Sequence, residues 1–313
     1  MTIDMPQSGQ FRVLVIFGGR SAERAVSLES GQAVAGALRS VGHTVGTWDP
    51  AATPMSDLHS ADWDIAFPML HGTGGEDGVL HRQLCAVGLP WVGCSIASSA
   101  LTFDKSLTRA RMQRYGIQVP LGTTITGRDT SAPIQFPVVV KPARQGSSIG
   151  VSMVRRQAEW GPAVDAALVW GSEVVVESYV AGREVSIPVI DGEVFPTVEI
   201  IVRDGWYDYD NKYKSDRTRY RVAPPDLPAN MNSIALMACE VCGVEGIARV
   251  DFRINETNQA YVLEINTIPG MTIRSLVPRS AAAAGLSLSE LCDRCVGTCM
   301  RRHDAEASDD RAK

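Results

Sequence analysis

The sequence has no excess of basic residues and no apolar run long enough to cross a membrane. Its 313 residues include 30 Lys and Arg against 35 Asp and Glu, a net charge of -5. The clustered positive charge that nucleic acids and acidic membranes attract is therefore not expected. Residues 1–10 are polar and lack the basic and apolar segments of a secretory leader. We expect a cytoplasmic protein that binds small molecules, with no nucleic-acid or membrane partner.

Cysteine is sparse as well, with seven residues, an odd number, and no spacing typical of a disulfide framework. Two C-x2-C pairs, Cys239 with Cys242 and Cys292 with Cys295, leave a zinc site as an alternative. Residues 287–299, however, read as a Ser-x-x-Glu capping box followed by the apolar stripe of a core-facing helix. Free cysteine packs as a small apolar side chain, so core packing is the preferred interpretation.

What the chain does have is 45% hydrophobic residues, enough for two or three compact units. Residues 12–17, 44–48 and 63–70 read as strands, the first and last followed by glycine-rich loops, with helical patterns between them. This alternation predicts a parallel-sheet α/β domain over residues 1–95. Strand ends that open into glycine-rich loops are where α/β folds place ligands.

Beyond residue 95 the pattern becomes mixed. It predicts a helix over residues 98–115, strands over 136–141 and 173–180, and a hairpin at Asp191-Gly192 between two apolar runs. A long polar and aromatic segment without a regular period then covers residues 204–221. A loop of that length inside a compact domain is usually an active-site cover. Its aromatic residues are Trp206, Tyr207, Tyr209, Tyr213 and Tyr220.

Two apolar segments near the C-terminus carry polar residues at alternate positions. Arg249 and Asp251 share one face of the first strand, and Glu264 and Asn266 share one face of the second. If the connecting turn is centred between residues 257 and 258, Asp251 stands opposite Glu264 and Arg249 opposite Asn266. The four polar groups then converge on one face of a single hairpin.

These groups suit a magnesium site. Two carboxylates and a carboxamide oxygen are hard ligands, and Mg2+ is usually bound by a few carboxylates together with nucleotide phosphates. Two ions on this face could hold both sides of a transferring phosphoryl group. A solvated hairpin face is the commoner alternative. Residues 267–272, however, add a Pro269-Gly270 turn whose free backbone N–H groups could stabilise an oxyanion.

Two glycine-rich stretches are further candidates. Lys141 ends a strand and precedes the Gly-Ser loop 143–150, a composition that suits a polyphosphate but also an ordinary surface turn. Gly18-Gly19 opens a helix, which could indicate a dinucleotide-dependent dehydrogenase, but the third glycine of that fingerprint is missing. Glu23, beside the same helix start, could complement the helix dipole or hold a substrate ammonium.

With these residues the chain resembles the D-alanine:D-alanine ligases, members of the ATP-grasp superfamily, from about Arg12 to about Leu291. The family's motifs occur in the family's order. They are Gly18-Gly19-x-Ser21-Ala22-Glu23, His71-Gly72, Gly75-Glu76-Asp77-Gly78, Asp104-Lys105, the 141–150 loop, Tyr207-Asp208-Tyr209, Lys212-Tyr213, Arg249-x-Asp251, Glu264-x-Asn266-Thr267, and Pro269-Gly270-Met271-Thr272 before Ser275-Leu276-Val277-Pro278.

The resemblance implies an ATP-grasp fold, α/β with an α+β ATP-binding part. An N-terminal parallel-sheet domain would cover residues 1–95, a central subdomain 96–183, and a C-terminal subdomain 184–300 that includes the loop 204–221. The charged residues 301–313 are expected to form a disordered tail. The family also suggests a homodimer.

Residue roles follow position by position from the same resemblance. The implied ATP-binding residues are Lys105, Lys141, Glu177, Ser178, Tyr179, Val180, Glu184 and Lys212. The implied ligands of two Mg2+ ions, which Mn2+ could replace, are Asp251, Glu264 and Asn266. Catalytic roles fall to Glu23, Ser147, Tyr213, Arg249 and Gly270, and further substrate contacts to His71, Ser275 and Leu276.

The implied reaction joins two D-alanines for peptidoglycan precursor synthesis. ATP would phosphorylate the first D-alanine, whose ammonium Glu23 holds, to an acyl phosphate. Arg249 and the Gly270 N–H would then stabilise the tetrahedral intermediate as the second amine attacks. The 204–221 loop would exclude water from the acyl phosphate. Tyr213 matches the ligases that make a dipeptide rather than a depsipeptide.

Four positions depart from the family pattern: Ser178, Ala25, Ile268 and Arg274. Arg274 precedes the expected second-substrate site, so a paralogue that joins a different amino acid or hydroxy acid, in an antibiotic or resistance pathway, is the alternative function. An ATP-binding regulatory module is a further alternative. It would lack metal ligands or oxyanion donors, and the sequence retains both.

Overall fold

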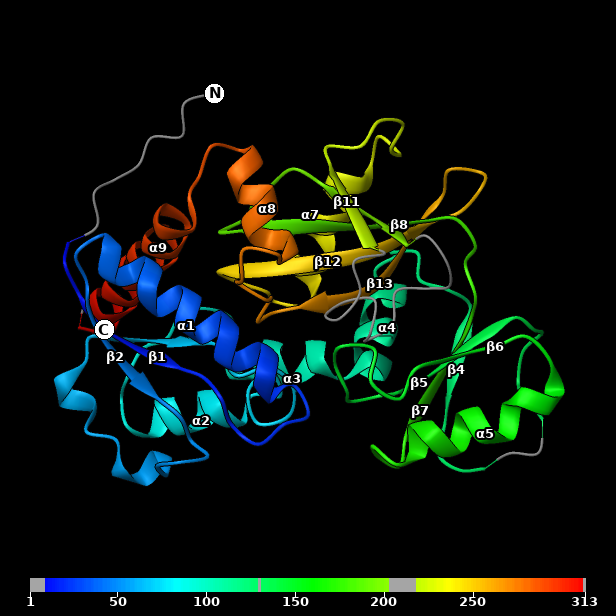
Figure 1. Ribbon diagram of the computed structural model, residues 1–313, viewed down its shortest axis with the longest axis horizontal. Helices are drawn as coiled ribbons and strands as arrows, with labels where there is room; N and C mark the ends of the chain where they lie inside the picture. Colours follow the sequence, from blue (N-terminus) through cyan, green and yellow to red (C-terminus); the bar gives the residue numbers. More distant parts are fainter. Residues whose placement is uncertain (1–8, 129–130, 203–217, 312–313) are drawn as a thin grey trace.

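The computed structural model describes residues 9–128, 131–202 and 218–311, and three sheets organise this part of the chain (Figure 1). The first sheet is parallel, in the order β2-β1-β3, which confirms the predicted N-terminal parallel sheet. Its elements are β1 (Arg12–Ile16), α1 (Arg24–Ser40), β2 (Thr44–Trp48), the 3-10 helices Met55–Asp57 and Ser60–Asp62, β3 (Ile65–Pro68) and α2 (Val79–Ala86).

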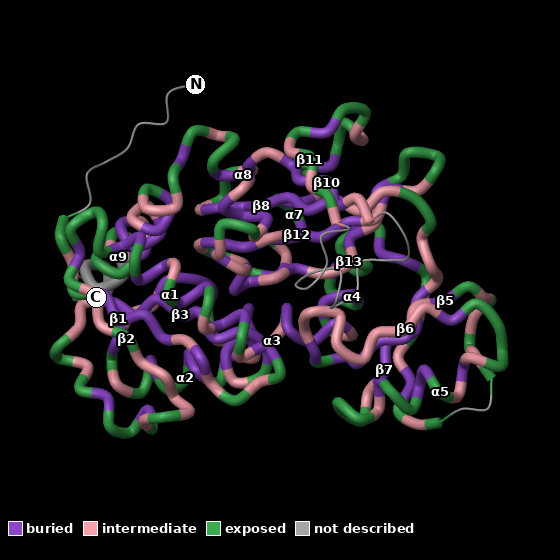
Figure 2. The backbone as a smooth tube through the Cα atoms, in the orientation of Figure 1, coloured by how far each residue is buried: buried purple, intermediate pink, exposed green. Residues whose placement is uncertain are grey.

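The central strand β1 is buried on both faces, as parallel strands usually are. Val13 and Val15 pack into one apolar cluster with α1, and Leu14 and Ile16 pack into a second cluster with α2. All four side chains are at most 1% exposed. Figure 2 shows this burial along the strands, with exposed residues concentrated in the connections.

The second sheet is antiparallel, in the order β4-β7-β5-β6, and α5 packs on it. Trp160 of α5 is 1% exposed and lies in one cluster with Val138 and Val176. The elements are β4 (Gly122–Ile125), β5 (Val138–Pro142), β6 (Ser152–Val154), α5 (Gln157–Leu168) and β7 (Val174–Ser178).

The third sheet follows the order β11-β10-β8-β12-β13, with β9 paired to β8. Helix α7 packs on it through Ala235 and Ala238, both fully buried. The elements are β8 (Arg183–Ile190), β9 (Glu193–Val194), β10 (Val198–Val202), β11 (Thr218–Val222), α7 (Met231–Val241), β12 (Ile247–Ile254), β13 (Ala260–Asn266) and α8 (Leu276–Ala283).

Both predicted hairpins are present. Asp191 and Gly192 have φ angles of 52° and 78° between β8 and β9, the left-handed pair that a tight hairpin turn needs. In the β12–β13 hairpin Asp251 pairs with Glu264 and Arg249 with Asn266, as predicted. The expected turn position was wrong, because Ile254 pairs with Ala260, which centres the turn on residue 257. A register shift just past the Asp251–Glu264 pair restores the predicted partners.

The helix predicted over residues 98–115 is two helices, α3 (Ile96–Phe103) and α4 (Lys105–Arg114). Asp104 separates them in an extended conformation and caps α4 by accepting hydrogen bonds from the backbone N–H groups of Ser106 and Leu107. Burial alone would raise the pKa of Asp104, but the hydrogen bonds from Ser106 and Leu107, together with Arg144, lower it below its usual value.

Residues 301–313 were expected to form a disordered tail, but the structure has a helix over most of them. Helix α9 (Leu288–Arg311) continues through most of residues 301–313. Its start has the predicted capping box: Glu290 accepts from the Ser287 N–H at 2.8 Å, and the Glu290 N–H donates to the Ser287 hydroxyl at 3.2 Å. The helix packs beside α1 against the first sheet, although it is distant from that sheet in sequence (Figure 1).

The cysteines of both C-x2-C pairs lie in apolar surroundings. Cys292 and Cys295 are at most 2% exposed in the cluster shared with the first sheet, and Cys239 and Cys242 are at most 5% exposed beside the third. Burial raises the pKa of the Cys239 thiol to about 12. These thiols pack as apolar side chains, which for Cys292 and Cys295 the helical stripe predicted.

Within the described part of the chain, no helix combines the length and apolarity needed to span a membrane.

Candidate active site

A cavity of about 860 Å³ brings together residues from all three sheet-containing parts of the chain. It also gathers most of the residues predicted to contact the substrates or the metal. The predicted residues that line it are Glu23, His71, Lys105, Ser147, Arg249, Glu264, Asn266, Gly270, Ser275 and Leu276.

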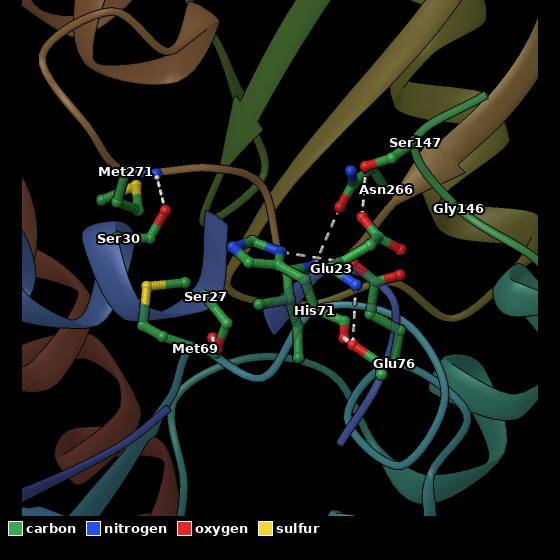
Figure 3. Close-up of polar contacts among 12 residues, drawn as sticks. Glu23, Ser27, Ser30, Met69, His71, Glu76, Gly146, Ser147, Asn266 and Met271 are labelled. Atoms are coloured by element: carbon green, nitrogen blue, oxygen red, sulfur yellow. Dashed lines mark hydrogen bonds and ion pairs between the residues drawn. The ribbon is translucent and has the colours of Figure 1, made fainter. Parts of the chain in front are cut away.

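Glu23 lies at the first turn of α1, as predicted, but its carboxylate accepts no capping hydrogen bond from that helix. It accepts instead from the hydroxyl of Ser147, which belongs to the Gly-Ser loop of the second part of the chain (Figure 3). Glu23 is only 4% exposed. The adjacent Gly146 leaves no room for a side chain, because a Cβ there would lie 2.4 Å from the Glu23 Oε1 atom.

The Gly-Ser loop holds a demanding backbone conformation. Ser147 and Ser148 have φ angles of 51° and 57°, in the left-handed region that residues other than glycine rarely adopt. Consecutive residues of this kind persist only where the surroundings hold them, and they occur preferentially at ligand sites. The Lys105 Nζ atom contributes by donating to the Gln145 carbonyl oxygen at 2.7 Å.

His71 lies beside Glu23 in the same cavity (Figure 3). Its carbonyl accepts from the Ser21 hydroxyl at 2.6 Å, and its Nδ1 atom is 3.7 Å from the Glu76 carboxylate. Among the described residues the buried Nε2 atom has no hydrogen-bond partner. Because an unpaired buried polar atom is costly, this nitrogen marks a position where a polar ligand group would be stabilised.

The polar face of the β12–β13 hairpin is occupied by paired charges. Arg249 donates twice to Asp251, from Nε and Nη2, each at 2.7 Å, and the Ser186 hydroxyl donates to Asp251 at 2.5 Å. The Lys105 Nζ atom is 3.2 Å from Glu264. Asp251 is 8% exposed, so this end of the face is buried, unlike the solvated hairpin face that was the alternative. Ser186 was not recognised as part of this face, because it belongs to β8, a strand distant in sequence.

The donor set of this face fits Mg2+ bound together with phosphate. Within the described ranges, no three His, Cys, Asp or Glu side chains gather as a metal-binding group. Asp251, Glu264 and the Asn266 oxygen are few, hard, oxygen ligands, so phosphate oxygens or water would have to complete an octahedral shell.

The cavity lining also includes the N-terminus of α8. Leu276 is its first residue, and the Ser275 hydroxyl accepts from the Thr272 N–H at 3.1 Å. The Met271 N–H donates to Ser30 of α1 at 3.2 Å, which fixes the turn after Gly270 against the first part of the chain. A helix N-terminus offers unpaired N–H groups to an anion, such as a substrate carboxylate.

Apart from Lys105, which lines the cavity, the described residues that were predicted to bind the nucleotide form two clusters outside this lining. In the first, Glu177 accepts from Lys141 and from Arg109, each at 2.6 Å, and all three residues are at most 8% exposed. The neighbouring backbone is also engaged, because the Ser178 N–H donates to the Leu121 carbonyl at 2.7 Å. Arg109 was missed from the sequence, since its helix gave no sign of which strand it would face.

The second cluster surrounds Arg253, which was also missed. Its guanidinium donates to the Val180 carbonyl and to the Tyr179 hydroxyl and forms an ion pair with Glu184, each at 3.0 Å. A signal for it was present, because Arg253 continues the alternation of Arg249 and Asp251 along β12. Three of the predicted nucleotide residues thus share one partner.

Two predicted residues of the long loop, Lys212 and Tyr213, lie outside the described residues. The loop was expected over residues 204–221, but its last part is a strand, since β11 begins at Thr218. Arg274, the unexplained departure, lines the cavity, and its carbonyl accepts from Arg279 at 2.9 Å. The Arg279 guanidinium lies over the ring of Tyr220, 4.8 Å from its centroid.

The chain is similar in sequence to known proteins. A family model described as D-ala D-ala ligase C-terminus matches residues 123–297. A D-alanine:D-alanine ligase of Mannheimia succiniciproducens is 39% identical over 292 residues, which cover 90% of this chain and 95% of that protein. D-alanine:D-alanine ligase B of Chromobacterium violaceum is 38% identical over 294 residues, which cover 92% and 97%.

Solved structures agree with the sequence relatives. The Bacillus anthracis D-alanine:D-alanine ligase complexed with ATP has a TM-score of 0.82 and 31% identity, covering 96% of this chain and 100% of that one. The Coxiella burnetii ligase has a TM-score of 0.81 and 26% identity, covering 97% of each. The predicted ATP-grasp fold is confirmed. The chain therefore belongs to the D-alanine:D-alanine ligase family.

Proposed function

We propose that this chain joins two D-alanine molecules into D-alanyl-D-alanine while converting ATP to ADP and phosphate, and that it supplies peptidoglycan precursor synthesis in the cytoplasm. Family membership supports the reaction class. The observation that carries the proposal is the contact between Glu23 and Ser147 inside the cavity that also contains Glu264 and Asn266. One cavity thereby offers a carboxylate for a substrate ammonium beside a face suited to Mg2+ and phosphate.

The first D-alanine would place its ammonium against Glu23. The Ser147 hydroxyl orients that carboxylate, and burial at 4% exposure strengthens its attraction for a cation. The unpaired Nε2 atom of His71 supplies a further polar contact in the same place. In this pose the substrate carboxylate points away from Glu23, toward the β12–β13 face where phosphoryl transfer would occur.

Phosphorylation makes the poor electrophile, a carboxylate, into an acyl phosphate. Lys105, already 3.2 Å from Glu264, would shift toward phosphate oxygens, and Lys141 would contribute from the nucleotide side. Two Mg2+ ions, or Mn2+ in their place, held by Asp251, Glu264 and Asn266 would neutralise charge on the phosphoryl oxygens. Lys212 and Tyr213 are further proposed contacts, from the family resemblance.

The second D-alanine would place its carboxylate at the N-terminus of α8, at Ser275 and Leu276. Its amine could then attack the acyl phosphate. Arg249 and the Gly270 N–H would stabilise the oxyanion, a contribution of about 3 to 4 kcal/mol per donor. The nucleotide itself would bind along Glu177, Ser178, Tyr179, Val180 and Glu184. A homodimer remains part of the proposal and is checked by light scattering.

The reaction is tested by phosphate release from ATP and Mg2+ with D-alanine, L-alanine or D-alanine plus D-lactate, together with mass analysis of the product. We expect release with D-alanine and a dipeptide product. Chelation of the metal should stop it. Release only with a different acceptor would contradict the substrate assignment and support a paralogue, in which case Arg274 is the first residue to exchange.

A further inference from the structure

Arg253 lies on the same face of β12 as Arg249 and Asp251. Residues 249, 251 and 253 are two apart, so their side chains leave the strand on the same side. Arg249 and Asp251 carry the proposed oxyanion and metal roles. Arg253 therefore extends the same face, and its cross-strand partners are Glu184 on β8 and Tyr261 on β13.

The guanidinium of Arg253 makes directed contacts in three directions. Nε donates to the Val180 carbonyl, Nη1 pairs with Glu184 Oε2, and Nη2 donates to the Tyr179 hydroxyl, each at 3.0 Å. The group also lies over the Tyr179 ring, 5.3 Å from its centroid. Its side chain is 14% exposed and that of Glu184 is 19% exposed, so solvent screens these contacts only partly.

These contacts hold the crossover between two sheets. Residues 179–182 join β7, in the four-stranded sheet, to β8, in the third sheet. On the other side of the crossover, Gly182 lies so close to β12 that a Cβ there would be 2.0 Å from the Ile254 carbonyl oxygen. The crossover is thus fixed to the end of β12 by a close backbone approach and by Arg253.

We infer that Arg253 is a positioning residue for the adenine nucleotide. It sets the Glu184 carboxylate for the ribose, and it holds the Val180 carbonyl and the Tyr179 side chain at the segment where the adenine edge would bind. This inference rests on the proposed function. The physical reason is preorganisation: groups ordered before binding lose less conformational freedom when the ligand arrives. Lysine cannot replace this role, because it lacks the planar fork that reaches three partners.

The test compares Arg253→Met and Arg253→Lys with Arg183→Met. Arg183 is the matched control. It starts β8 one residue before Glu184, and its contacts are Glu199 at 2.7 Å and the carbonyls of Pro225 and Asp226. ADP binding in the presence of Mg2+ is measured by calorimetry, and KM for ATP, KM for D-alanine and kcat are measured on the same preparations.

Arg253→Met should weaken ADP binding and raise KM for ATP by about tenfold or more, while kcat and KM for D-alanine change by about twofold at most. Arg253→Lys should recover only part of the loss. Arg183→Met should leave ADP binding and KM for ATP unchanged. Thermal melting of each variant shows how much of any effect is loss of folded protein. If Arg253→Met does not fold, Arg253→Lys is the deciding variant.

ADP binding by Arg253→Met at wild-type strength would overturn the inference and leave the proposed function standing. Equal losses in kcat, KM for D-alanine and KM for ATP would also overturn it, because a general structural role predicts that pattern. Failure of the wild-type chain to bind ADP would remove the proposed function, and the inference with it.

Discussion

At the scale of single residues, Asp251 and Glu264 face each other across the β12–β13 hairpin in different surroundings. Asp251 accepts a bidentate pair of hydrogen bonds from Arg249 and one from Ser186, and it is nearly buried. Glu264 has a side chain 27% exposed with Lys105 at 3.2 Å. Removing either carboxylate would remove a proposed Mg2+ ligand. The loss of Asp251 would also break the bidentate contact with Arg249, whereas Lys105, beside Glu264, keeps its hydrogen bond to the Gln145 carbonyl.

Glu264→Gln therefore separates catalysis from stability. We expect turnover to fall by about 100-fold or more, because a proposed metal ligand and its charge are lost from the phosphoryl-transfer site. The melting temperature should change by only about 2 °C, since Glu264 is partly exposed and Lys105 keeps its hydrogen bond to the Gln145 carbonyl. Steady-state assays and thermal melting make the comparison.

Asp251→Asn is the companion variant, with a similar loss of turnover but a clearly lower melting temperature. Near-normal ligation by Glu264→Gln at saturating Mg2+ would show that Glu264 holds no metal.

Gly146→Ala tests the place of Glu23. A Cβ at this position would meet the Glu23 carboxylate at 2.4 Å, and that carboxylate is the end of a flexible side chain. Glu23 should therefore move rather than the backbone, so the fold persists while the proposed ammonium site is displaced. We expect KM for the first D-alanine to rise by about tenfold, measured at saturating ATP.

Gly36→Ala is the matched control, because Gly36 lies within α1 and a Cβ there would meet nothing within 4 Å. Alanine is the better helix former, so this variant should be stabilised by up to about 1 kcal/mol with unchanged kinetics. If both variants had the wild-type KM, Glu23 would not hold the substrate ammonium.

At the scale of elements, helix α2 is packed in a way that makes it sensitive to acid. His81 is 1% exposed, lies edge-on to the Trp91 ring, and has a buried Nδ1 atom with no partner among the described residues. Burial is the main cause that lowers the pKa of His81 to about 4, although the nearby Asp77 opposes it. Protonation would place a charge on a buried side chain of α2.

The sign follows from proton binding. Between pH 6.5 and about 4 the unfolded chain binds a proton at His81 that the folded chain does not, so folding stability falls as the pH falls through this window. The loss is at most about 3 kcal/mol. His81→Leu should remove that part of the fall, as measured by urea unfolding at several pH values. His59→Gln, at an exposed position, should leave the fall intact.

The β12–β13 hairpin shows how far sequence reaches at this scale. The partners Asp251–Glu264 and Arg249–Asn266 were predicted correctly because polar residues alternate on both strands. The turn was misplaced, since a register shift changes the strand count by one and leaves no local mark in the sequence. The break between α3 and α4 was missed because Asp104 is compatible with a helix, and only its capping contacts identify it as a boundary.

Contacts between distant segments were the least predictable part of the site. Ten of the residues that the family motifs identified line one cavity, but Arg109, Ser186 and Arg253 were missed. Each contacts a partner on another element, and only Arg253, which continues the alternation along β12, had a local signal in the sequence. Burial has the same limit: strand alternation placed Asp251 on the polar face of the hairpin, but it could not show that Arg249 and Ser186 cover it.

At the scale of the whole molecule, the division of the chain into domains 1–95, 96–183 and 184–300 stays a prediction. One hydrophobic cluster contains residues from more than one of these predicted domains. The cluster on one face of the first sheet includes Val13 and Phe67, but also Ile247 of β12 and Leu291 of α9. The last helix therefore completes the core of the first sheet, which a division by chain order cannot express.

Stepwise truncation tests this assembly. Deletion of 288–313 would remove the buried stripe of α9, including Cys295 and Val296, and uncover apolar residues of the first sheet. We expect no soluble folded protein, because burying each large apolar side chain contributes about 1.5 to 3 kcal/mol. Expression, solubility and thermal melting provide the measurement.

Two shorter truncations separate the stripe from the end of the helix. Deletion of 301–313 removes Arg302, which pairs with Glu245 at 2.8 Å in a partly exposed contact. Its melting temperature should fall by only about 2 °C. Deletion of 306–313 keeps that contact and should leave melting and activity unchanged. Wild-type stability after deletion of 288–313 would mean that the first sheet folds without α9, and that the domain boundaries follow chain order after all.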